Sequence, residues 1–375
     1  MELTWDGVLA WRLRRQFLDP VGSASAVEVV SRLCGVHAQV SSAAELAVAV
    51  RQTDPRVGAL REALEDRPLE DRPLLKTWAM RGTLHALTVE QAPTFLSLLA
   101  ASRSWERAAW QRAFLSAAQL AALTEVVLAA LDGRVLGREE LVAEVAERTG
   151  DPRLVEQLRS GWGAALKPLA WQGMLCHGPA RGNRVTFTRP DTWLPDWSGL
   201  VEPEQAARVA IPAYLAAYGP ATPEAFDRWL TRGVSKKGAL RAWFAALEDE
   251  LVTVDVEGQQ GYARATDIDE LASSHPSQVV RLLPGFDQYV LGPGTNDTRI
   301  IPAGRRALVS KAAGWISPVV VAGGRVAGTW ETTADALAVS LFPESGTVAR
   351  EALEAEAARL GAVLGTSLSL SVSSV

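Results

Sequence analysis

The sequence predicts an α+β protein in which three helical units, each ending in a β-hairpin, precede a strand-rich carboxy-terminal domain. Three observations support this fold class. The chain has 375 residues, enough for roughly two to four compact modules. An order of helices followed by two short strands recurs along it, and after about residue 274 the pattern changes to apolar strands separated by Gly and Pro.

The first unit, expected over residues 1–115, is the least regular. Apolar residues at helical spacing predict helices over 2–17, 25–36 and 43–51, and a further helical stretch near 57–64. Residues 74–87 contain two apolar runs that fold back at Arg81-Gly82, which predicts a hairpin.

The second unit, expected over residues 116–200, has the clearest pattern. Helices are predicted over 119–131, 138–148 and 154–172, and Pro168 should kink or divide the last of them. Residues 174–177 and 184–188 predict two strands, joined by a turn-rich stretch between them.

The third unit, expected over residues 201–272, repeats this order. Helices are predicted over 202–218 and 222–230, and a third passes through Leu240 and Trp243. A hairpin over 251–265 completes the unit. Three helices and a two-stranded wing are the parts of a winged helix-turn-helix, whose third helix usually enters the major groove of DNA.

The carboxy-terminal part, expected over residues 273–375, is predicted as a separate β-rich, barrel-like domain. Its expected strands are 279–283, 289–291, 315–321, 325–330 and 336–342, and one late helix covers 347–360. Because no long flexible linker separates the units, we expect them to pack into one rigid body.

Composition and motifs exclude several classes of protein. No apolar run approaches membrane-spanning length and no leader precedes the first helix, so a cytoplasmic protein without a membrane partner is expected, nucleoid-associated when bound to DNA. Cys34 and Cys176 lack metal-ligand spacing and are predicted to be buried thiols. A phosphate-binding Gly loop and a Gly-x-Ser-x-Gly motif are missing, so we expect neither a metal nor a nucleotide cofactor.

Basic residues form local clusters although the net charge of −5 argues mildly against DNA binding. Each cluster could also be an ordinary solvated face. Arg81, at the turn of the first hairpin, could contact a phosphate or enter a minor groove. The residues predicted to contact DNA are Arg12, Arg14, Arg15, Lys76, Arg81, Lys236, Lys237, Arg241, Arg305 and Arg306.

The segment around His37 is the strongest candidate for chemistry. In an extended backbone His37 and Gln39 would point the same way, whereas on a continuing helix they would diverge by about 200°. Side by side, an imidazole and a carboxamide can hold one water molecule. From spacing alone, a histidine that caps the helix or fills the core is the commoner interpretation.

Four stretches together resemble the AlkZ and YcaQ family of DNA glycosylases over nearly the whole chain. They are His37-Ala38-Gln39, residues 77–85, the Leu-Pro-Gly-Phe-Asp-Gln stretch within 283–292, and the Gly-Gly-Arg-Val-Ala-Gly-Thr-Trp stretch at 323–330. The resemblance implies three winged-helix modules and a carboxy-terminal β-domain, arranged as a C shape around duplex DNA.

The resemblance also implies a catalytic motif of two polar residues that flank an apolar one. Gln39 matches this motif, and His37 departs from the commoner Gln and is similar to a branch that acts on bulky guanine adducts. The expected activity is hydrolysis of the N-glycosidic bond of alkylated purines, in particular N7-alkylguanine in duplex DNA, in repair or self-resistance. The implied protein is a monomer.

Two other functions remain open. A noncatalytic winged-helix regulator would bind DNA sequence-specifically, with base contacts from Lys236, Lys237 and Arg241, and would be expected as a dimer. A protein-interaction scaffold would need no nucleic acid, which is consistent with the negative net charge.

Overall fold

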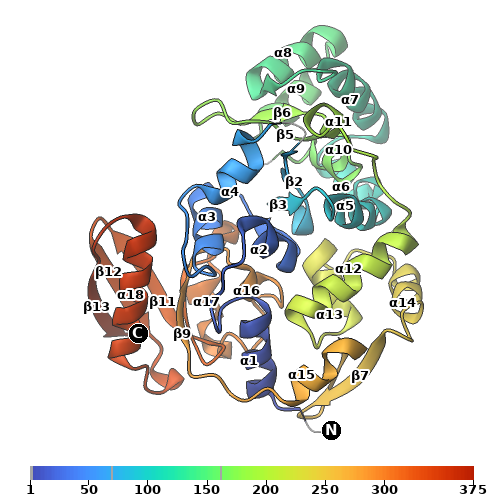
Figure 1. Cartoon of the computed structure of the whole chain (residues 1–375). Helices are drawn as coiled ribbons and strands as arrows, with labels where there is room; N and C mark the ends of the chain where they lie inside the picture. The colour runs from blue at the N-terminus through green and yellow to red at the C-terminus, as the bar shows by residue number, and fades with distance from the viewer. Residues whose placement is uncertain (1–2, 69–70, 161–162) are drawn as a thin grey trace. The chain divides into compact units, whose positions relative to one another are not determined.

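The computed structural model describes residues 3–68, 71–160 and 163–375, and it combines helices with antiparallel and mixed β-sheets (Figure 1). The predicted mixed α+β class is therefore confirmed. Contacts divide the chain into two compact units. One contains Met1–Leu60, Ile211–Trp229 and Phe244–Val375, and the other contains Arg61–Ala210 and Leu230–Trp243. The division into four sequential modules stays a prediction.

The second of these units contains a helical bundle and a small antiparallel sheet. Strands β3, β2, β5, β6 and β4 follow one another in the sheet. Its elements are a π-helical turn (Glu62–Asp66), β2 (Leu74–Trp78), β3 (Leu84–Thr88), α5 (Ala92–Ala101), α6 (Ala108–Ala113), α7 (Ala117–Ala130), β4 (Leu136–Gly137), α8 (Arg138–Thr149), α9 (Pro152–Arg159), α10 (Lys167–Trp171), β5 (Cys176–His177), β6 (Thr186–Thr188) and α11 (Pro190–Trp193). The short helix α4 (Ala59–Arg61) precedes them at the division between the units.

Local sequence explains several boundaries in this unit. Ser116 and Gln119 form a capping box that begins α7, and Gly150 ends α8 in the left-handed region. The predicted helix 154–172 is divided, as expected near Pro168, which lies in the first turn of α10. Residues 161–162 of that prediction lie outside the described residues.

In the amino-terminal part of the first unit, helix α1 (Trp5–Arg15) packs on the two-stranded sheet of β7 (Leu251–Val256) and β8 (Gln259–Arg264). The other elements of this part are α2 (Ala26–Arg32), β1 (Val36–His37) and α3 (Ser41–Ala49). Trp5 and Trp11 of α1 share a buried core with Val254 of β7 and with α15 (Ile268–Ala272). Figure 1 shows α1 near α15 and β7.

A chain of aromatic rings connects three helices with the hairpin of β7 and β8 (Gln259–Arg264). Tyr214 of α12 (Pro203–Tyr218) contacts Phe226 of α13 (Pro223–Thr231). Phe226 contacts Phe244 of α14 (Lys237–Ala245), and Phe244 contacts Tyr262 of β8. The three helices and the hairpin predicted for this segment are therefore present in the expected order.

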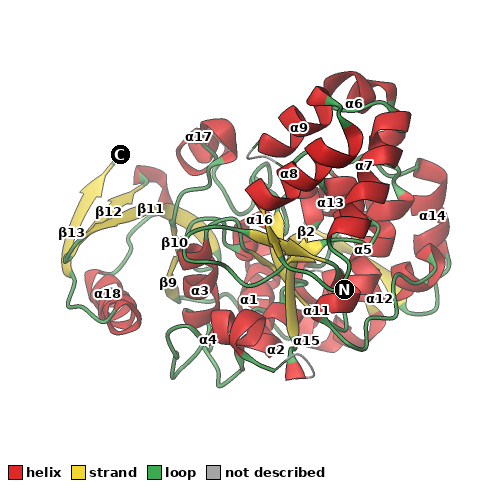
Figure 2. Cartoon of the chain, turned by 90° about the horizontal axis from the view of Figure 1, so that it is seen from above, coloured by secondary structure: helices red, strands yellow, loops and turns green. Residues whose placement is uncertain are grey.

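The carboxy-terminal sheet is open. Its five strands follow the order β13 (Ser369–Ser374), β12 (Ala336–Leu341), β11 (Arg325–Thr333), β10 (Val319–Ala322) and β9 (Val280–Leu283). Helix α18 (Arg350–Leu364) covers one face of this sheet (Figure 2), where its Leu353, Ala357 and Leu360 pack on Val280 and Leu282. Within the described residues β9 and β13 are its edges, so the expectation of a barrel-like domain is wrong.

Three local predictions for this part are also corrected. Residues 289–291 belong to helix α16 (Gln288–Leu291), because the Asp287 side chain accepts a hydrogen bond from the Tyr289 backbone N–H and begins a helix there. The predicted strand 315–321 begins only at Val319, since residues 310–317 form a tight loop. Strand β13 was not predicted, because its Ser-rich sequence is mostly exposed and pairs in parallel with distant β12.

No helix among the described residues has the length and apolar character needed to cross a membrane.

Candidate active site

The segment that carries His37 is extended. Helix α2 begins with a capping box between Ser25 and Glu28 and ends at Arg32, earlier than expected. Cys34 and Gly35 then adopt positive φ angles of 54° and 102°, which turn the chain out of the helix into β1. The expected extended backbone is therefore present at Val36–His37, whereas Gln39 lies in a bend, and the joint orientation of the two side chains stays a prediction.

The two predicted catalytic side chains differ in exposure. His37 is 4% exposed and Ala38 is 2% exposed, whereas Gln39 lies at the surface. Gln39 thus presents its carboxamide to solvent one residue beyond the buried part of the motif. The imidazole is therefore almost enclosed.

Phe286 fixes the plane of the imidazole. The rings of His37 and Phe286 are parallel within 3° and their centroids are 4.6 Å apart. Phe286 itself has a φ angle of 62°, a conformation that costs a bulky residue energy unless the surroundings impose it. A strained residue in contact with a candidate catalytic ring indicates a position held for function.

A buried ion pair holds the backbone beside Phe286. The Asp287 carboxylate accepts hydrogen bonds from both terminal nitrogens of Arg51, at 2.7 and 2.8 Å, and both side chains are inaccessible to solvent. Arg51 also donates to the carbonyl oxygens of Gln16 and Ala47. This arrangement ties the 283–287 loop to the ends of α1 and α3, on either side of His37.

Arg12 is not available to DNA in this structure. It is 2% exposed, and its guanidinium donates to the carbonyl oxygens of Gly219 and Pro220 at 3.0 and 3.1 Å. Burial lowers the pKa of Arg12, and the nearby Asp297 carboxylate partly opposes that shift. The expected phosphate contact by Arg12 is therefore wrong, because its side chain joins α1 to the turn after α12.

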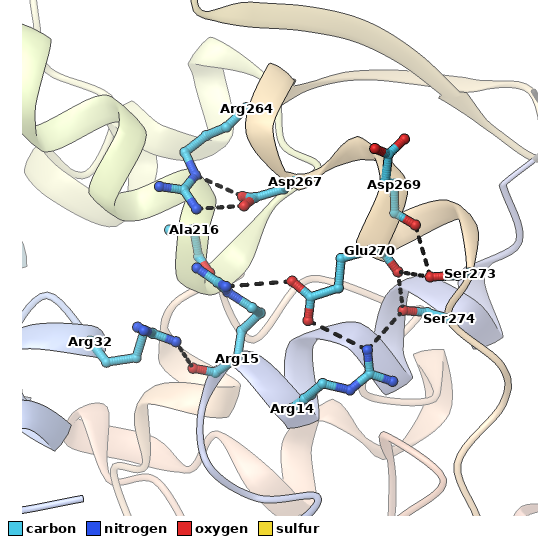
Figure 3. A network of polar contacts seen from close by, with 10 residues as sticks. All are labelled: Arg14, Arg15, Arg32, Ala216, Arg264, Asp267, Asp269, Glu270, Ser273 and Ser274. Atoms are coloured by element: carbon cyan, nitrogen blue, oxygen red, sulfur yellow. Dashed lines mark hydrogen bonds and ion pairs between the residues drawn. The ribbon is translucent and has the colours of Figure 1, made fainter.

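Arg14 and Arg15 converge on one carboxylate (Figure 3). Glu270 accepts a hydrogen bond from each of them at 3.4 Å. Arg15 also donates to the carbonyl oxygen of Ala216, whereas the Arg14 side chain stays 43% exposed. Of the three arginines at the end of α1, Arg14 keeps the largest accessible charge, although Glu270 neutralises part of it.

The predicted basic residues of the other unit lie on two segments. Lys76 is half-buried in β2, where burial lowers its pKa, and Arg81 occupies the hairpin turn with a φ angle of 57°. Lys236, Lys237 and Arg241 are exposed at the beginning of α14. The α14 cluster therefore offers more accessible positive charge than the hairpin does.

Arg305 and Arg306 have different environments. Arg305 forms two hydrogen bonds to the Glu344 carboxylate, at 2.6 and 2.8 Å, and that contact lowers the pKa of Glu344 to about 2. Arg306 is exposed. Of this pair, Arg305 is neutralised by Glu344, and Arg306 is the residue that offers an exposed positive charge.

Both cysteines are buried and free, as predicted. Burial raises the pKa of Cys34 to about 12 and raises the pKa of Cys176 further. A thiol in that state is a poor nucleophile near neutral pH. Neither cysteine is therefore a candidate for catalysis.

Sequence reasoning assigned no role to Phe286, Asp287 or Arg51. The first two lie in a stretch that was noted as part of a motif, but their spacing gives no sign of a partner at His37 or Arg51. The ion pair spans 236 positions in sequence, so local pattern could not reveal it.

Comparisons with known proteins identify the family. A family model described as "DNA glycosylase AlkZ-like" matches residues 30–363, which include the His37 segment and most of the carboxy-terminal sheet. A protein of Streptomyces sahachiroi named "Interstrand DNA cross-link repair glycosylase" is 49% identical over 369 residues, covering 98% of each chain. The solved structure of Streptomyces sahachiroi DNA glycosylase AlkZ superposes with a TM-score of 0.93 at 48% identity, covering 100% of both chains. The chain therefore belongs to the AlkZ-like family of DNA glycosylases, enzymes that hydrolyse N-glycosyl bonds in DNA repair.

Proposed function

We propose that this DNA glycosylase removes N7-alkylated guanine from duplex DNA, including guanine that carries a bulky substituent. His37 and Gln39 are the residues to which we assign catalysis. The observation that carries this assignment is an imidazole held flat against Phe286, two residues before an exposed carboxamide, in a segment covered by the family match.

The chemistry suits a site with modest catalytic groups. Alkylation at N7 gives guanine a positive charge, so the base leaves as a neutral molecule and no strong general acid is needed. Water forms a bond to the anomeric carbon while the bond from that carbon to the base nitrogen breaks. The bonding electrons pass to the base, and the water proton passes to the imidazole of His37.

The different exposure of His37 and Gln39 suggests a different role for each. Gln39, at the surface, can hold the attacking water by accepting from it and donating to it. His37, nearly enclosed and fixed in plane, can take the proton and stabilise the positive sugar of the transition state. A positioned base of this kind contributes about 10²- to 10⁴-fold.

We also propose a winged helix-turn-helix for α12, α13, α14 and the β7–β8 hairpin. Their order and the aromatic contacts from Tyr214 to Tyr262 support this assignment. The exposed Lys236, Lys237 and Arg241 at the start of α14 would then contact the DNA backbone. A C-shaped monomer of three such modules and a β-domain remains part of the same proposal.

The test is a glycosylase assay on three synthetic duplexes. One carries a single N7-methylguanine, one a bulky N7-guanine adduct, and one an interstrand cross-link, chosen because the Streptomyces sahachiroi relative is named for cross-link repair. Alkali converts each abasic product to a strand break, which is counted in single-turnover time courses. We expect breaks at the lesion in the first two duplexes.

Matched variants then test the assignment of His37 and Gln39. His37→Ala and Gln39→Ala should each slow excision about 10²-fold or more without loss of duplex binding. Gln278→Ala, an exposed glutamine of the same unit, serves as the control and should excise at the wild-type rate. Unchanged excision by the His37→Ala, Gln39→Ala double variant would refute the catalytic assignment.

A further inference from the structure

A cavity of about 610 Å³ lies beside the His37–Phe286 stack, within one compact unit of the chain. Phe286 belongs to both features, since its ring contacts the imidazole and also lines the cavity. The remaining wall comes from the start of α3, the loop that ends in Trp315, and strands β11 and β12. A cavity with no assigned ligand therefore adjoins the segment that we propose to be catalytic.

The wall of this cavity is aromatic. Trp315 and Phe286 meet at 80° with their centroids 5.1 Å apart, so two ring surfaces are set at right angles. Trp330 is fixed nearby by a hydrogen bond from its indole nitrogen to the Leu283 carbonyl oxygen at 2.9 Å. A planar group that stacks on the face of Trp315 would therefore meet Phe286 with its edge, and both contacts are favourable for aromatic rings.

Trp315 is held out of the core by its backbone. The residue is 49% exposed. Among the residues that the structure describes, it is the one tryptophan that counts as exposed. The backbone N–H of Lys311 donates to the Trp315 carbonyl oxygen at 2.8 Å, and Ser317 is bonded to Val309 and Leu308 just beyond. Because a tied loop presents this indole, its exposure is a property of the fold.

The cavity wall carries one negative and one positive side chain, which suits a nucleotide with a cationic base and an anionic phosphate. Glu331 contributes an exposed carboxylate to the wall, and Lys311 contributes an exposed ammonium group. An aromatic face and a carboxylate together favour a planar cation over its neutral counterpart. The ammonium group is suited to a phosphate oxygen of the same nucleotide.

We propose that this cavity binds the alkylated guanine base itself, stacked on the exposed ring of Trp315 with its edge toward Phe286 and its positive charge near Glu331. This inference rests on the proposed action on N7-alkylguanine and adds that the base leaves the DNA stack before its bond is cleaved. The volume exceeds that of one purine, so the cavity also accommodates a substituent at N7.

The first arm of the test measures binding without DNA. 7-Methylguanosine, buffered below neutrality so that the base stays cationic, is titrated against wild-type protein and followed by tryptophan fluorescence, with guanosine as the neutral probe. We expect 7-methylguanosine to bind more tightly than guanosine. Trp315→Ala should weaken binding about 5- to 150-fold, and Trp315→Phe should restore much of it.

Glu331 is tested by its preference for the cation. Glu331→Gln should reduce the preference for 7-methylguanosine over guanosine by up to about fivefold, as for an exposed ion pair. Glu351→Gln, at an exposed position of α18, is the matched control and should leave that preference unchanged. Equal binding of both nucleosides by wild-type protein would contradict the charge argument.

The second arm uses duplex DNA with 2-aminopurine next to N7-methylguanine. Wild-type protein should raise the 2-aminopurine fluorescence as the lesion unstacks, and Trp315→Ala should raise it less and excise more slowly. If wild-type protein excises the base while Trp315→Ala does so equally fast, the cavity proposal fails and the proposed function stands. If wild-type protein excises no N7-alkylguanine at all, the proposed function fails, and the nucleoside titration still decides on the cavity.

Discussion

Replacing Asp287 by Asn tests whether the buried ion pair with Arg51 both stabilises the fold and positions Phe286. The substitution keeps the shape of the side chain but removes the charge that balances a fully buried guanidinium. Breaking one partner of such a pair typically costs about 3–5 kcal/mol. The lower part of that range is expected, because Arg51 retains its bonds to the carbonyl oxygens of Gln16 and Ala47.

Urea unfolding monitored by circular dichroism measures this loss, and the double variant Arg51→Met, Asp287→Leu is its control. A pair of apolar side chains leaves no unbalanced charge, so the double variant should recover part of the lost free energy of unfolding. The recovery is partial because the cap of Asp287 on Tyr289 and the bonds of Arg51 to Gln16 and Ala47 are also lost. An Asp287→Asn variant that loses less than about 1 kcal/mol would refute the argument that burial makes the pair essential.

The same variant should slow excision, because Asp287 follows Phe286 directly in the strained loop. Phe286→Leu and Phe286→Tyr separate positioning from stability. Loss of the parallel ring should slow excision about two- to tenfold in Phe286→Leu, whereas Phe286→Tyr should retain the wild-type rate. Single-turnover excision, measured where each variant is folded, gives the comparison. Equal rates for the two variants would show that the stack does not position His37.

Three further predictions concern buried groups away from the cavity. Burial lowers the pKa of His177 from 6.5 to about 3, so unfolding takes up a proton in that range and stability falls as the pH drops below about 6.5. The free energy of unfolding of wild-type protein should be about 2 kcal/mol smaller at about pH 5 than at about pH 7, and His177→Leu should lose most of that difference in urea titrations. Cys34 and Cys176 should resist a thiol reagent in native buffer and react rapidly in denaturant, and fast native labelling would contradict their burial. Gly324→Ala should lower the free energy of unfolding by about 2–4 kcal/mol, because the new Cβ would lie 2.6 Å from the Cβ of Leu9 and the φ angle is 87°. Gly346→Ala is the control for thermal unfolding: its φ angle is 72° but its Cβ would meet open space, so the loss should be smaller.

The elements formed by local pattern could be predicted from sequence. Helix α12, the β7–β8 hairpin and the β5–β6 hairpin occur close to where periodicity placed them. The reason is that helix and strand repeats, capping residues and turn glycines act between neighbouring residues. The prediction failed at residues 369–374 because strand β13 forms only by pairing with distant β12. At residues 289–291 it failed for a local reason, the helix cap formed by Asp287.

Sequence alone also located the candidate catalytic segment. The polar, apolar, polar triplet made His37 and Gln39 candidates, while spacing alone favoured a capping or core histidine, and the catalytic assignment came from the resemblance to a glycosylase family. The extended backbone at Val36–His37 was decided by the positive φ angles of Cys34 and Gly35, which end the helix before it. The triplet is a local feature that the sequence showed, whereas the turn before it was missed, because the helix was expected to continue to residue 36.

What surrounds that segment was decided by tertiary structure. Arg12 looked like a DNA contact because it lies in a basic cluster, yet its partners Gly219 and Pro220 are more than 200 positions away and bury it. Phe286 reaches His37 across a similar span, held by Asp287 and Arg51. Burial and pairing depend on which distant segments meet in the folded chain, and a single sequence without those contacts does not specify them.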